Sequence, residues 1–508
     1  METSIYLINP RERAPGAHSA EFLRAWGIAN IVGLADLSTT TVAALAPAGW
    51  TVTICDERIQ PVDFDIKADV IGITGKVSQR DRMIELSAEF RRRGKRVLIG
   101  GPYASLSPED MRPHADILVV GEFEEIAAKV FADIAAGSWQ AEYAGTKADL
   151  NLSPIPRWDL YPNKFATHGQ VQTSRGCPFE CEFCDVIQYL GRKQRWKDPD
   201  RVIAELEVLY GLGYRAVLLA DDNFTVVRKR ARALLERLAE WNNSRPEGSM
   251  RFVTQVSIDA AKDPELLRLC VEAGMRTVFI GIETPNPESL AETLKRQNLR
   301  IDLAEEVRKV VRAGLAVNAG IIVGFDHDGP DIFERQAAFI QSLPAPCPSP
   351  GLLHAPPSTP LYARIVREGR LIGHTRMGTR ELVETNIRPL KMSERELKEG
   401  FCWLLNRVFS PAAFGGRVEA FASLYPPRES TQRGAYYLRG LPHARRLAKY
   451  GRNERDLLSL MDGICHRRPE LRDYLMGFLS YYCQARYRME LEGVWNPALA
   501  DRDTPLAA

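Results

Sequence analysis

Residues 173–185 of this 508-residue chain read TSRGCPFECEFCD, with three cysteines inside eight positions. The cysteines are Cys177, Cys181 and Cys184, spaced C-x3-C-x2-C directly after an apolar run that predicts a strand. A glycine and a proline beside the first cysteine disfavour a helix, so we expect a loop that can wrap around a compact ligand. Thiolates bind soft metals and iron–sulfur clusters. Three ligands on a four-iron cluster would leave one iron open, as chemistry on a coordinated substrate requires.

Two other uses of these cysteines are open. A structural zinc ion would normally take a fourth Cys or His close by, and the local candidate is His168, at the far end of the preceding strand. Free buried thiols are the second use, which is also our interpretation of six cysteines scattered singly along the chain. Nine cysteines do not form a disulfide framework, and the odd count fits a reduced compartment. The six single cysteines are Cys55, Cys270, Cys347, Cys402, Cys465 and Cys483.

The composition is that of a soluble globular protein, with 45% hydrophobic and 26% charged residues. A formal net charge of +2 gives no reason to expect nucleic acid as a partner. The N-terminus lacks the features of a signal peptide, and no stretch approaches the roughly 18 apolar residues that a membrane-spanning helix needs. We therefore predict a cytoplasmic protein, and the chain length predicts two or three domains.

Residues 168–374, around the cysteine loop, alternate helices with buried strands. Helices are predicted at Val202–Tyr210, Pro264–Ala273 and Leu303–Ala313, and each is followed by glycine and then by an apolar strand. Glycine ends a helix easily because it adopts the left-handed conformation. About six such units predict a partial (β/α)6 barrel, with its active site at the carboxyl ends of the strands.

Residues 1–135 show the same alternation and predict a separate α/β domain with a doubly wound (Rossmann-like) parallel sheet. Such sheets bind ligands beyond the carboxyl ends of their strands, and three of the predicted ends are rich in glycine. These ends are Gly72–Gly75, Gly100–Tyr103 and Gly121–Glu122. Residues 136–167 contain three prolines and predict a linker.

Residues 375–508 predict a mostly helical region. It contains a basic stretch, Arg439–Arg455, and aromatic residues at helical spacing, among them Tyr474, Phe478 and Tyr482. We interpret the charges as a solvated face and the aromatic residues as core. The alternatives are a surface that docks peripherally on the inner face of a membrane and a region that covers the substrate.

The cysteine loop resembles the signature of radical S-adenosylmethionine (SAM) enzymes. The resemblance implies a [4Fe–4S] cluster on the three cysteines, with SAM chelated by the open iron. Reductive cleavage of SAM then gives a 5′-deoxyadenosyl radical that takes hydrogen from a substrate, with electrons from a donor such as flavodoxin or ferredoxin. By this resemblance the SAM-binding residues are Phe183 against adenine, Asp222 and Asn223 near the methionyl amino group, Glu283, and Gly320, Ile322 and Gly324 of a G-x-I-x-G strand. Residues 221–223 stand where the family commonly has Gly-Gly-Glu.

The N-terminal domain resembles the cobalamin-binding domain that precedes the barrel in class B radical SAM enzymes. Glycines there would let the backbone approach the corrin closely. Asp56 is not followed by the His of an Asp-x-His-x-x-Gly motif, so no histidine is predicted as axial cobalt ligand. A dinucleotide is the competing ligand of such a domain, but no G-x-G-x-x-G follows an early strand. The resemblance assigns cobalamin to Gly72, Thr74, Gly75, Gly100, Gly101, Pro102, Tyr103, Gly121 and Glu122.

Residues 184–187, 279–285, 320–328 and 409–414 are similar to hopanoid C-methylases and their relatives. The similarity implies methylation of an unactivated carbon of a lipid or natural-product intermediate. Methylcobalamin would supply the methyl group to a substrate radical, and a second SAM would remethylate the cobalamin. Oxidation, cyclisation or ring rearrangement without methyl transfer is the first alternative, and a non-enzymatic iron–sulfur or corrinoid-binding protein is the second.

No catalytic residue is predicted. His327, His354 and Tyr362 are expected only to line the substrate site. The segment 354–362 departs from its counterpart in the relatives, and residues after 420 do not match them. Because both regions are expected to meet the substrate, its identity is not predicted.

Overall fold

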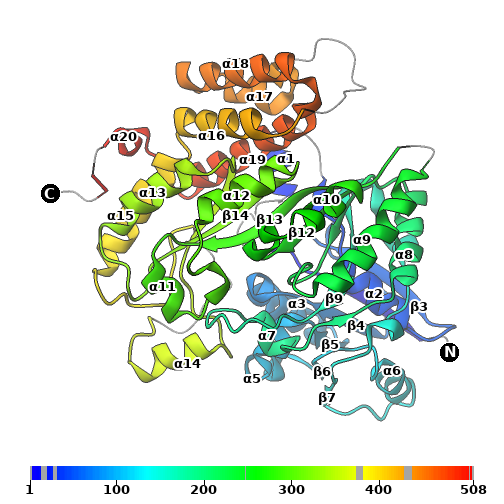
Figure 1. Ribbon diagram of the computed structural model, residues 1–508. Coiled ribbons are helices and arrows are strands. Elements are labelled where there is room, and N and C mark those ends of the chain that lie inside the picture. The colour runs from blue at the N-terminus through cyan, green and yellow to red at the C-terminus, as the bar shows by residue number, and fades with distance from the viewer. Residues whose placement is uncertain are drawn as a thin grey trace.

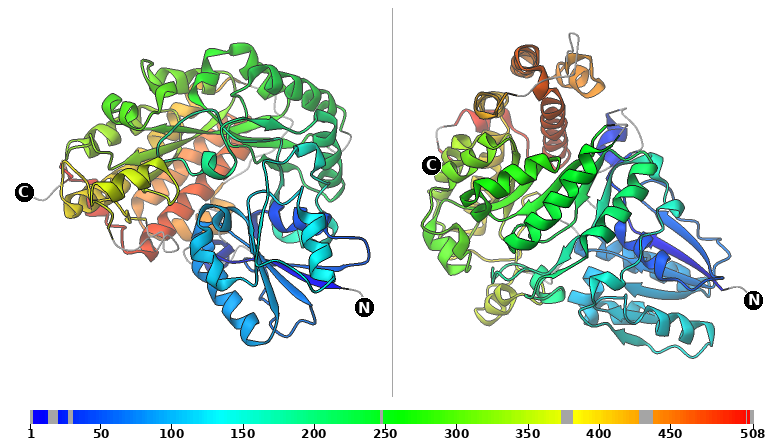
Figure 2. Two further views of the ribbon diagram at one scale, coloured as in Figure 1. Left: turned by 90° about the horizontal axis from the view of Figure 1, so that it is seen from below. Right: turned by 45° about the vertical axis from the view of Figure 1, so that its right-hand side comes forward.

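The computed structural model describes residues 3–12, 20–26, 31–245, 248–372, 382–427, 438–502 and 504–505. These residues form two parallel sheets, a short ribbon and a C-terminal group of helices (Figure 1). The second sheet and its helices lie between the first sheet and the C-terminal helices, as Figures 1 and 2 show. The predicted α/β class, with a doubly wound domain, a partial barrel and a helical C-terminal region, is confirmed.

The first sheet has the strand order β3-β1-β4-β5-β6-β7. Its strands are short apolar runs because helices cover both faces and leave few positions exposed to water. The chain reverses direction across the sheet between β1 and β4, and such a reversal opens a crevice at the carboxyl ends of the strands. The elements are β1 (Ser4–Asn9), β3 (Thr51–Asp56), β4 (Val70–Thr74), β5 (Arg96–Gly100), β6 (Ile117–Val120), β7 (Glu142–Ala144), α2 (Leu37–Leu45), α3 (Arg80–Arg92), α4 (Pro102–Leu106), α5 (Pro108–Met111) and α6 (Ala127–Ala135).

The second sheet has the order β15-β14-β13-β12-β11-β8-β2, and neighbouring strands from β8 to β15 follow one another along the chain. This is the open half-barrel expected from consecutive βα units. Gly213, Gly274 and Gly314 have φ of 93°, 98° and 101° just after three of its helices, which confirms the predicted helix ends. The elements are β8 (Ala166–Val171), β11 (Ala216–Leu219), β12 (Arg251–Val256), β13 (Met275–Glu283), β14 (Ala316–Val323), β15 (Cys347–Leu352), α8 (Pro199–Gly211), α9 (Arg228–Asn243), α10 (Pro264–Glu272), α11 (Pro287–Glu292), α12 (Leu303–Arg312), α13 (Ile332–Ser342) and α14 (Pro360–Arg367).

Two short strands each add an edge to one of the sheets. β7 lies within residues 136–167 and pairs with β6, whereas β2 (Val32–Leu34) leaves the N-terminal residues and pairs with β8. Each gives hydrogen-bond partners to a strand that would otherwise be an unpaired edge. The last strand, β15, contains two prolines, which are tolerated because it is an edge strand.

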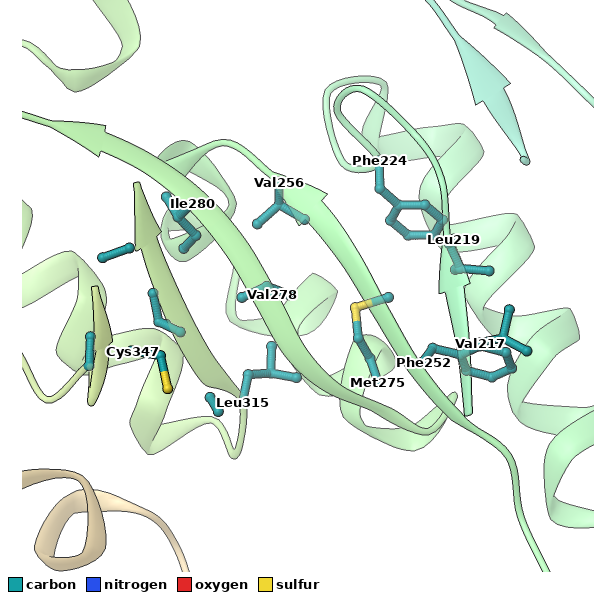
Figure 3. Close-up of a cluster of buried hydrophobic side chains, with 14 of the residues drawn as sticks. Val217, Leu219, Phe224, Phe252, Val256, Met275, Val278, Ile280, Leu315 and Cys347 are labelled. Atoms are coloured by element: carbon teal, nitrogen blue, oxygen red, sulfur yellow. The ribbon is translucent and has the colours of Figure 1, made fainter. Parts of the chain in front are cut away.

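Buried apolar side chains from neighbouring strands form the core of the half-barrel (Figure 3). Val217, Phe252, Val278 and Ile280 are at most 1% exposed. Burial of each such side chain contributes about 1.5–3 kcal/mol. Because a shift of one residue would move these side chains to the other face, the core fixes the register and hence where each strand ends.

The C-terminal helices pack on one another through an aromatic cluster that includes Tyr474 and Phe478, two of the residues that we predicted as core. The rings of Phe421, Tyr425, Tyr474 and Phe478 lie 5.0–6.1 Å apart in successive contacts. No helix in the described part of the chain is long and apolar enough to cross a membrane. The helices are α15 (Glu394–Val408), α16 (Pro411–Leu424), α17 (Pro442–Leu447), α18 (Arg452–Arg467), α19 (Arg472–Leu491) and α20 (Pro497–Ala500).

Candidate active site between the two sheets

The three-cysteine loop begins just after β8 and is closed at its base by an antiparallel ribbon of β9 (Ser174–Arg175) and β10 (Arg195–Trp196). The Cys177 N–H donates to the carbonyl of Gly191 at 3.2 Å. Gly176 has φ of 93°, and a Cβ there would lie 2.9 Å from the Gly191 carbonyl oxygen, so the closure requires glycine. The loop therefore has a defined, compact shape before any ligand is considered.

Two aspartates at the end of β11 hold the start of this loop. The buried carboxylate of Asp221 accepts hydrogen bonds from the backbone N–H groups of Thr173 and Ser174 at 2.7 and 2.8 Å. Asp222 accepts one from the N–H of Gly176 at 2.8 Å. Burial raises the pKa of each aspartate to about 6. Asp222, predicted to bind SAM, thus lies directly beside the cysteine loop.

Substitution Asp221→Ala is expected to lower the free energy of unfolding by about 1–3 kcal/mol for each buried N–H left without an acceptor. A thermal melt of the cluster-free protein measures this loss. Asp159→Ala, which removes an exposed partner of Arg157, is the control and should change little. An unchanged melting temperature for Asp221→Ala would show that water replaces the carboxylate.

Two side-chain amides face the cysteine sulfurs. Asn223 Nδ2 lies 4.0 Å from Cys177 Sγ, and Gln297 Nε2 lies 3.8 Å from Cys181 Sγ. Amide N–H donors stabilise negative charge on sulfur and are among the groups that set the potential of an iron–sulfur cluster. Three thiols on one loop, with amide donors beside two of them, fit such a cluster.

The zinc alternative finds no support from its candidate ligand. His168 lies at the start of β8, where its Nδ1 is 3.1 Å from the carbonyl oxygen of Gly33 on the paired strand β2. The cysteine loop lies beyond the opposite end of the same strand. His168 therefore does not join the three cysteines.

Removing an amide beside a cluster ligand is expected to make the cluster harder to reduce. Asn223→Leu and Gln297→Met keep approximate side-chain volume but lose the N–H donor, so we expect more negative midpoint potentials than in the wild type. A redox titration followed by electron paramagnetic resonance (EPR) measures the shift. The exposed Asn151→Leu serves as control, and equal potentials in all four proteins would contradict the role of the amides.

Glu283 ends β13 in a strained conformation. Its φ is 66°, a left-handed value that is uncommon for a residue other than glycine, and the pairing with β14 shifts register at this point. The side chain is buried, and Oε1 lies 2.7 Å from Nζ of Lys295. Burial alone would lower the pKa of Lys295, but the adjacent carboxylate outweighs it and raises that pKa. Backbone strain of this kind concentrates at functional sites.

A small cluster of buried apolar side chains lies beside the residues predicted to meet adenine. Phe183 and Ile322 pack against this cluster, as does Tyr362. The rings of Phe183 and Phe325 lie 6.4 Å apart. Gly320 lies in β14, the strand of Ile322, and Gly324 follows its last residue. A Cβ on Gly320 would lie 2.8 Å from the ring of Phe279, which is closer than real contacts of a Cβ, so this position requires glycine.

A cavity of about 480 Å³, which we call the interface cavity, lies between the carboxyl ends of the two sheets. Seven of the nine residues predicted to bind cobalamin line it, and the second sheet contributes its own strand ends. Asp222 and α7 (Val186–Tyr189), which follows the third cysteine, also line it, so the cavity adjoins the cysteine loop. The seven residues are Gly72, Thr74, Gly100, Gly101, Pro102, Gly121 and Glu122.

Gly75 and Tyr103 lie behind this lining. The Tyr103 N–H donates to the carbonyl of Gly75 at 3.1 Å, and its buried hydroxyl donates to Asp110 at 2.7 Å. These contacts brace the glycine-rich edge from the rear.

Sequence reasoning missed several polar residues in the cavity wall. Gln170 is the next-to-last residue of β8, Gln172 lies just beyond the end of β8, and Gln255 lies near the end of β12. The sequence alone did not show which side of either strand would face the first domain.

The three residues expected to line a substrate site are not in the interface cavity wall among the described residues. His327 Nδ1 contacts the carboxylate of Glu292, and the ring lines a separate pocket of about 370 Å³ beside α11. Tyr362 belongs to the apolar cluster around Phe183, and His354 follows β15.

Comparisons with known proteins give this site a chemical context. Residues 171–340 match the model of the radical SAM superfamily, and residues 359–486 match a domain of unknown function, DUF4070. An uncharacterized methyltransferase of Synechocystis is 36% identical over 412 residues, covering 78% of this chain and 75% of that protein. Hopanoid C-2 methylase of Rhodopseudomonas palustris is 36% identical over 339 residues, covering 65% of this chain and 64% of that enzyme.

Two more distant proteins are also similar to this chain. An anaerobic magnesium-protoporphyrin IX monomethyl ester cyclase of Rubrivivax gelatinosus is 24% identical, covering 65% of this chain and 64% of that enzyme. The structure of the radical SAM methyltransferase TsrM of Kitasatospora setae, with cobalamin and a [4Fe–4S] cluster bound, superposes with a TM-score of 0.59 at 16% identity, covering 92% of this chain and all of that one. A radical SAM domain implies a [4Fe–4S] cluster and SAM as cofactors, and the cysteine loop with its amide donors fits the cluster. The chain therefore belongs to the radical SAM superfamily and, within it, to the family of methyltransferases that includes hopanoid C-2 methylase.

Proposed function

We propose that this protein methylates an unactivated carbon of a lipid or small natural-product intermediate, with cobalamin held in the interface cavity. The observation that carries the proposal is the position of that cavity. One wall is the glycine-rich edge of the first sheet, and the other adjoins the cysteine loop. Cobalamin can supply a methyl group to a carbon radical, whereas the methyl group of SAM is electrophilic.

The residues of the first sheet suit a large planar ligand. Gly72, Gly100 and Gly101 line the cavity at the strand ends, where a macrocycle can lie against backbone. A Cβ on Gly72 would lie 2.6 Å from Leu7, and a Cβ on Gly101 would lie even closer to Thr74, so packing within the domain also requires glycine at these two positions.

Gln170, Gln172 and Gln255 make the cavity wall polar on the side of the second sheet. The side chains of Gln170 and Gln172 already hydrogen-bond to Ala35, Ala220 and Arg175, so their remaining capacity is what a corrin amide could use.

The residues around the cysteine loop suit SAM. Phe183 and Ile322 offer apolar surface to an adenine ring, and the carboxylate of Glu283 offers an acceptor to an ammonium or ribose hydroxyl. Lys295 fixes the position of that carboxylate through a buried ion pair. The chain would thus orient two cofactors at one junction and exclude water from it.

Anaerobic turnover of the reconstituted protein with SAM, a reductant and methylcobalamin tests the proposal. Candidate lipid and natural-product substrates are supplied, and mass spectrometry follows 5′-deoxyadenosine, S-adenosylhomocysteine and a product heavier by one CH2. Both nucleoside products are expected, and both should disappear when the reductant is omitted. 5′-Deoxyadenosine with neither S-adenosylhomocysteine nor a product heavier by one CH2 would contradict methyl transfer.

The second candidate is oxidation or cyclisation with the same cofactors, and the observation that favours it is the similarity of the chain to the cyclases. It predicts 5′-deoxyadenosine and a product that has lost hydrogen rather than gained CH2. The same mass measurement therefore separates the two reactions.

A peripheral contact with the membrane and an electron donor of the flavodoxin or ferredoxin type stay predictions. Within the basic stretch, Arg446 donates to the carbonyl of Ala25 at 2.6 Å and lies over the ring of Trp26, so it has an intramolecular role. Arg445 and Lys449 are exposed and are the better test of membrane contact. If Arg445→Gln together with Lys449→Gln leaves liposome binding unchanged, the basic stretch is not a docking surface.

A further inference from the structure

Four charged side chains, which we call the bridging cluster, join the first domain to the base of the cysteine loop. Glu122 and Glu124 belong to the first domain, and Arg175 and Arg195 belong to the ribbon. Glu122 accepts hydrogen bonds from Arg175 at 2.8 Å and from Arg195 at 2.5 and 2.8 Å. Glu124 accepts one from Arg175 at 2.6 Å. Both carboxylates are at most 5% exposed, and both guanidinium groups at most 15%.

The two arginines need these carboxylates. Arg175 and Arg195 stand directly opposite each other in the ribbon of β9 and β10, the ribbon that closes the cysteine loop. Like charges directly opposite on paired strands destabilise the pair, and a buried charge without a partner is costly. Both carboxylates come from the turn between β6 and α6 in the first domain. The turn therefore supplies the two carboxylates that pair with the arginines, and its docking favours closure of the ribbon.

The same turn forms part of the interface cavity wall. Gly121, Glu122, Phe123 and Glu124 all line the cavity, and so does Arg175. Arg175 also donates through Nε to the side-chain oxygen of Gln172 at 2.7 Å, and Gln172 is a further lining residue. The same buried charges therefore line the ligand cavity on one side and hold the base of the cysteine loop on the other.

We propose that Glu122 and Glu124 are positioning residues that couple occupancy of the interface cavity to the geometry of the cysteine loop. Filling the cavity would hold the turn in place, the turn would hold the ribbon, and the ribbon would hold Cys177, two residues beyond Arg175. Coupling between two binding sites is reciprocal, so a ligand in the cavity tightens SAM binding at the loop and SAM tightens binding in the cavity. This rests on the proposed function only in naming cobalamin as the ligand.

The test uses the full chain with its cluster reconstituted, in wild-type form and as Glu122→Gln and Glu124→Gln. Glu142→Gln is the matched control, because it removes an exposed ion pair with Arg112 in the same domain. SAM affinity is measured by equilibrium dialysis with and without hydroxocobalamin, and the EPR spectrum of the reduced cluster is recorded in each state. We expect hydroxocobalamin to tighten SAM binding about fivefold or more in the wild type and the control. In both variants the factor should fall toward one, with an altered cluster spectrum.

Glu122→Gln leaves the charge of Arg195 partly uncompensated and can lower stability for that reason alone. The melting temperature and the coupling factor of Glu122→Gln are therefore compared with those of the double variant Glu122→Gln/Arg195→Gln, at matched iron content. The double variant should restore the melting temperature but not the coupling. Restored coupling in the double variant would overturn the proposal.

Two results would overturn the coupling directly: a wild-type factor of one with cobalamin bound, or an unchanged factor in both single variants. A wild-type protein that retains no hydroxocobalamin contradicts the proposed function instead. In that case the cluster spectra decide the positioning role, since altered spectra in the variants support it and unchanged spectra overturn it.

Discussion

Cys181→Ala is expected to lower 5′-deoxyadenosine formation by about 10³-fold or more, the scale on which loss of one member disables a catalytic unit. Cys181 is the most buried of the three loop cysteines, and Gln297 lies beside its sulfur. Two thiols cannot replace three as ligands to a four-iron cluster, so the iron content should fall in parallel. Anaerobic reconstitution followed by iron analysis and mass spectrometry with SAM and dithionite measures both losses.

Cys402→Ala is the matched control for this loss. Cys402 lies on α15, is partly buried and is remote in sequence from the loop. The control should bind iron and form 5′-deoxyadenosine as the wild type does. Full iron content and turnover in Cys181→Ala would mean that the loop does not hold the cluster.

Gly100→Leu is expected to weaken cobalamin retention by about fivefold to about 100-fold, since overpacking costs about 1–3 kcal/mol and 1.4 kcal/mol is a factor of ten in affinity. Gly100 ends β5 and lines the interface cavity. A Cβ there would lie 3.5 Å from Cβ of Val119, which is an ordinary contact, so the backbone tolerates a side chain. The rest of the leucine would occupy space that the ligand needs.

Absorbance of bound hydroxocobalamin after gel filtration measures the effect of Gly100→Leu, and the iron content should stay unchanged. Gly211→Leu is the matched control, because a Cβ at Gly211, at the end of α8, meets nothing within 4 Å. If Gly100→Leu retains as much cobalamin as Gly211→Leu, the cofactor does not lie against β5.

The features that sequence predicted correctly are those coded by neighbours along the chain. The glycines after α8, α10 and α12 adopt the expected left-handed conformation because a helix end is a local event. The cysteine spacing predicted a compact loop for the same reason, since Gly176 supplies the turn that closes it. Each strand of the first sheet that was expected from an apolar run is present.

The features that sequence did not show depend on residues far apart in the chain. β2 joins the second sheet although its neighbours along the chain belong to the first, because the edge of β8 offers it hydrogen-bond partners. Lys295 and Gln297 reach the SAM and cysteine residues from a segment more than 100 positions beyond the loop. Glu122, assigned to cobalamin by resemblance, lines the cavity but also binds two arginines of the ribbon.

By itself the sequence therefore determined the cysteine loop, the order of the βα units and the glycine-rich edge, since short-range spacing and periodicity encode all three, and it predicted the three cysteines as cluster ligands. Only the tertiary structure decided which strand ends face each other, which polar groups line the interface cavity and which charges bridge the domains. The physical reason is that the packing of the two sheets fixes the direction of each side chain, and that packing is set by burial across the whole core.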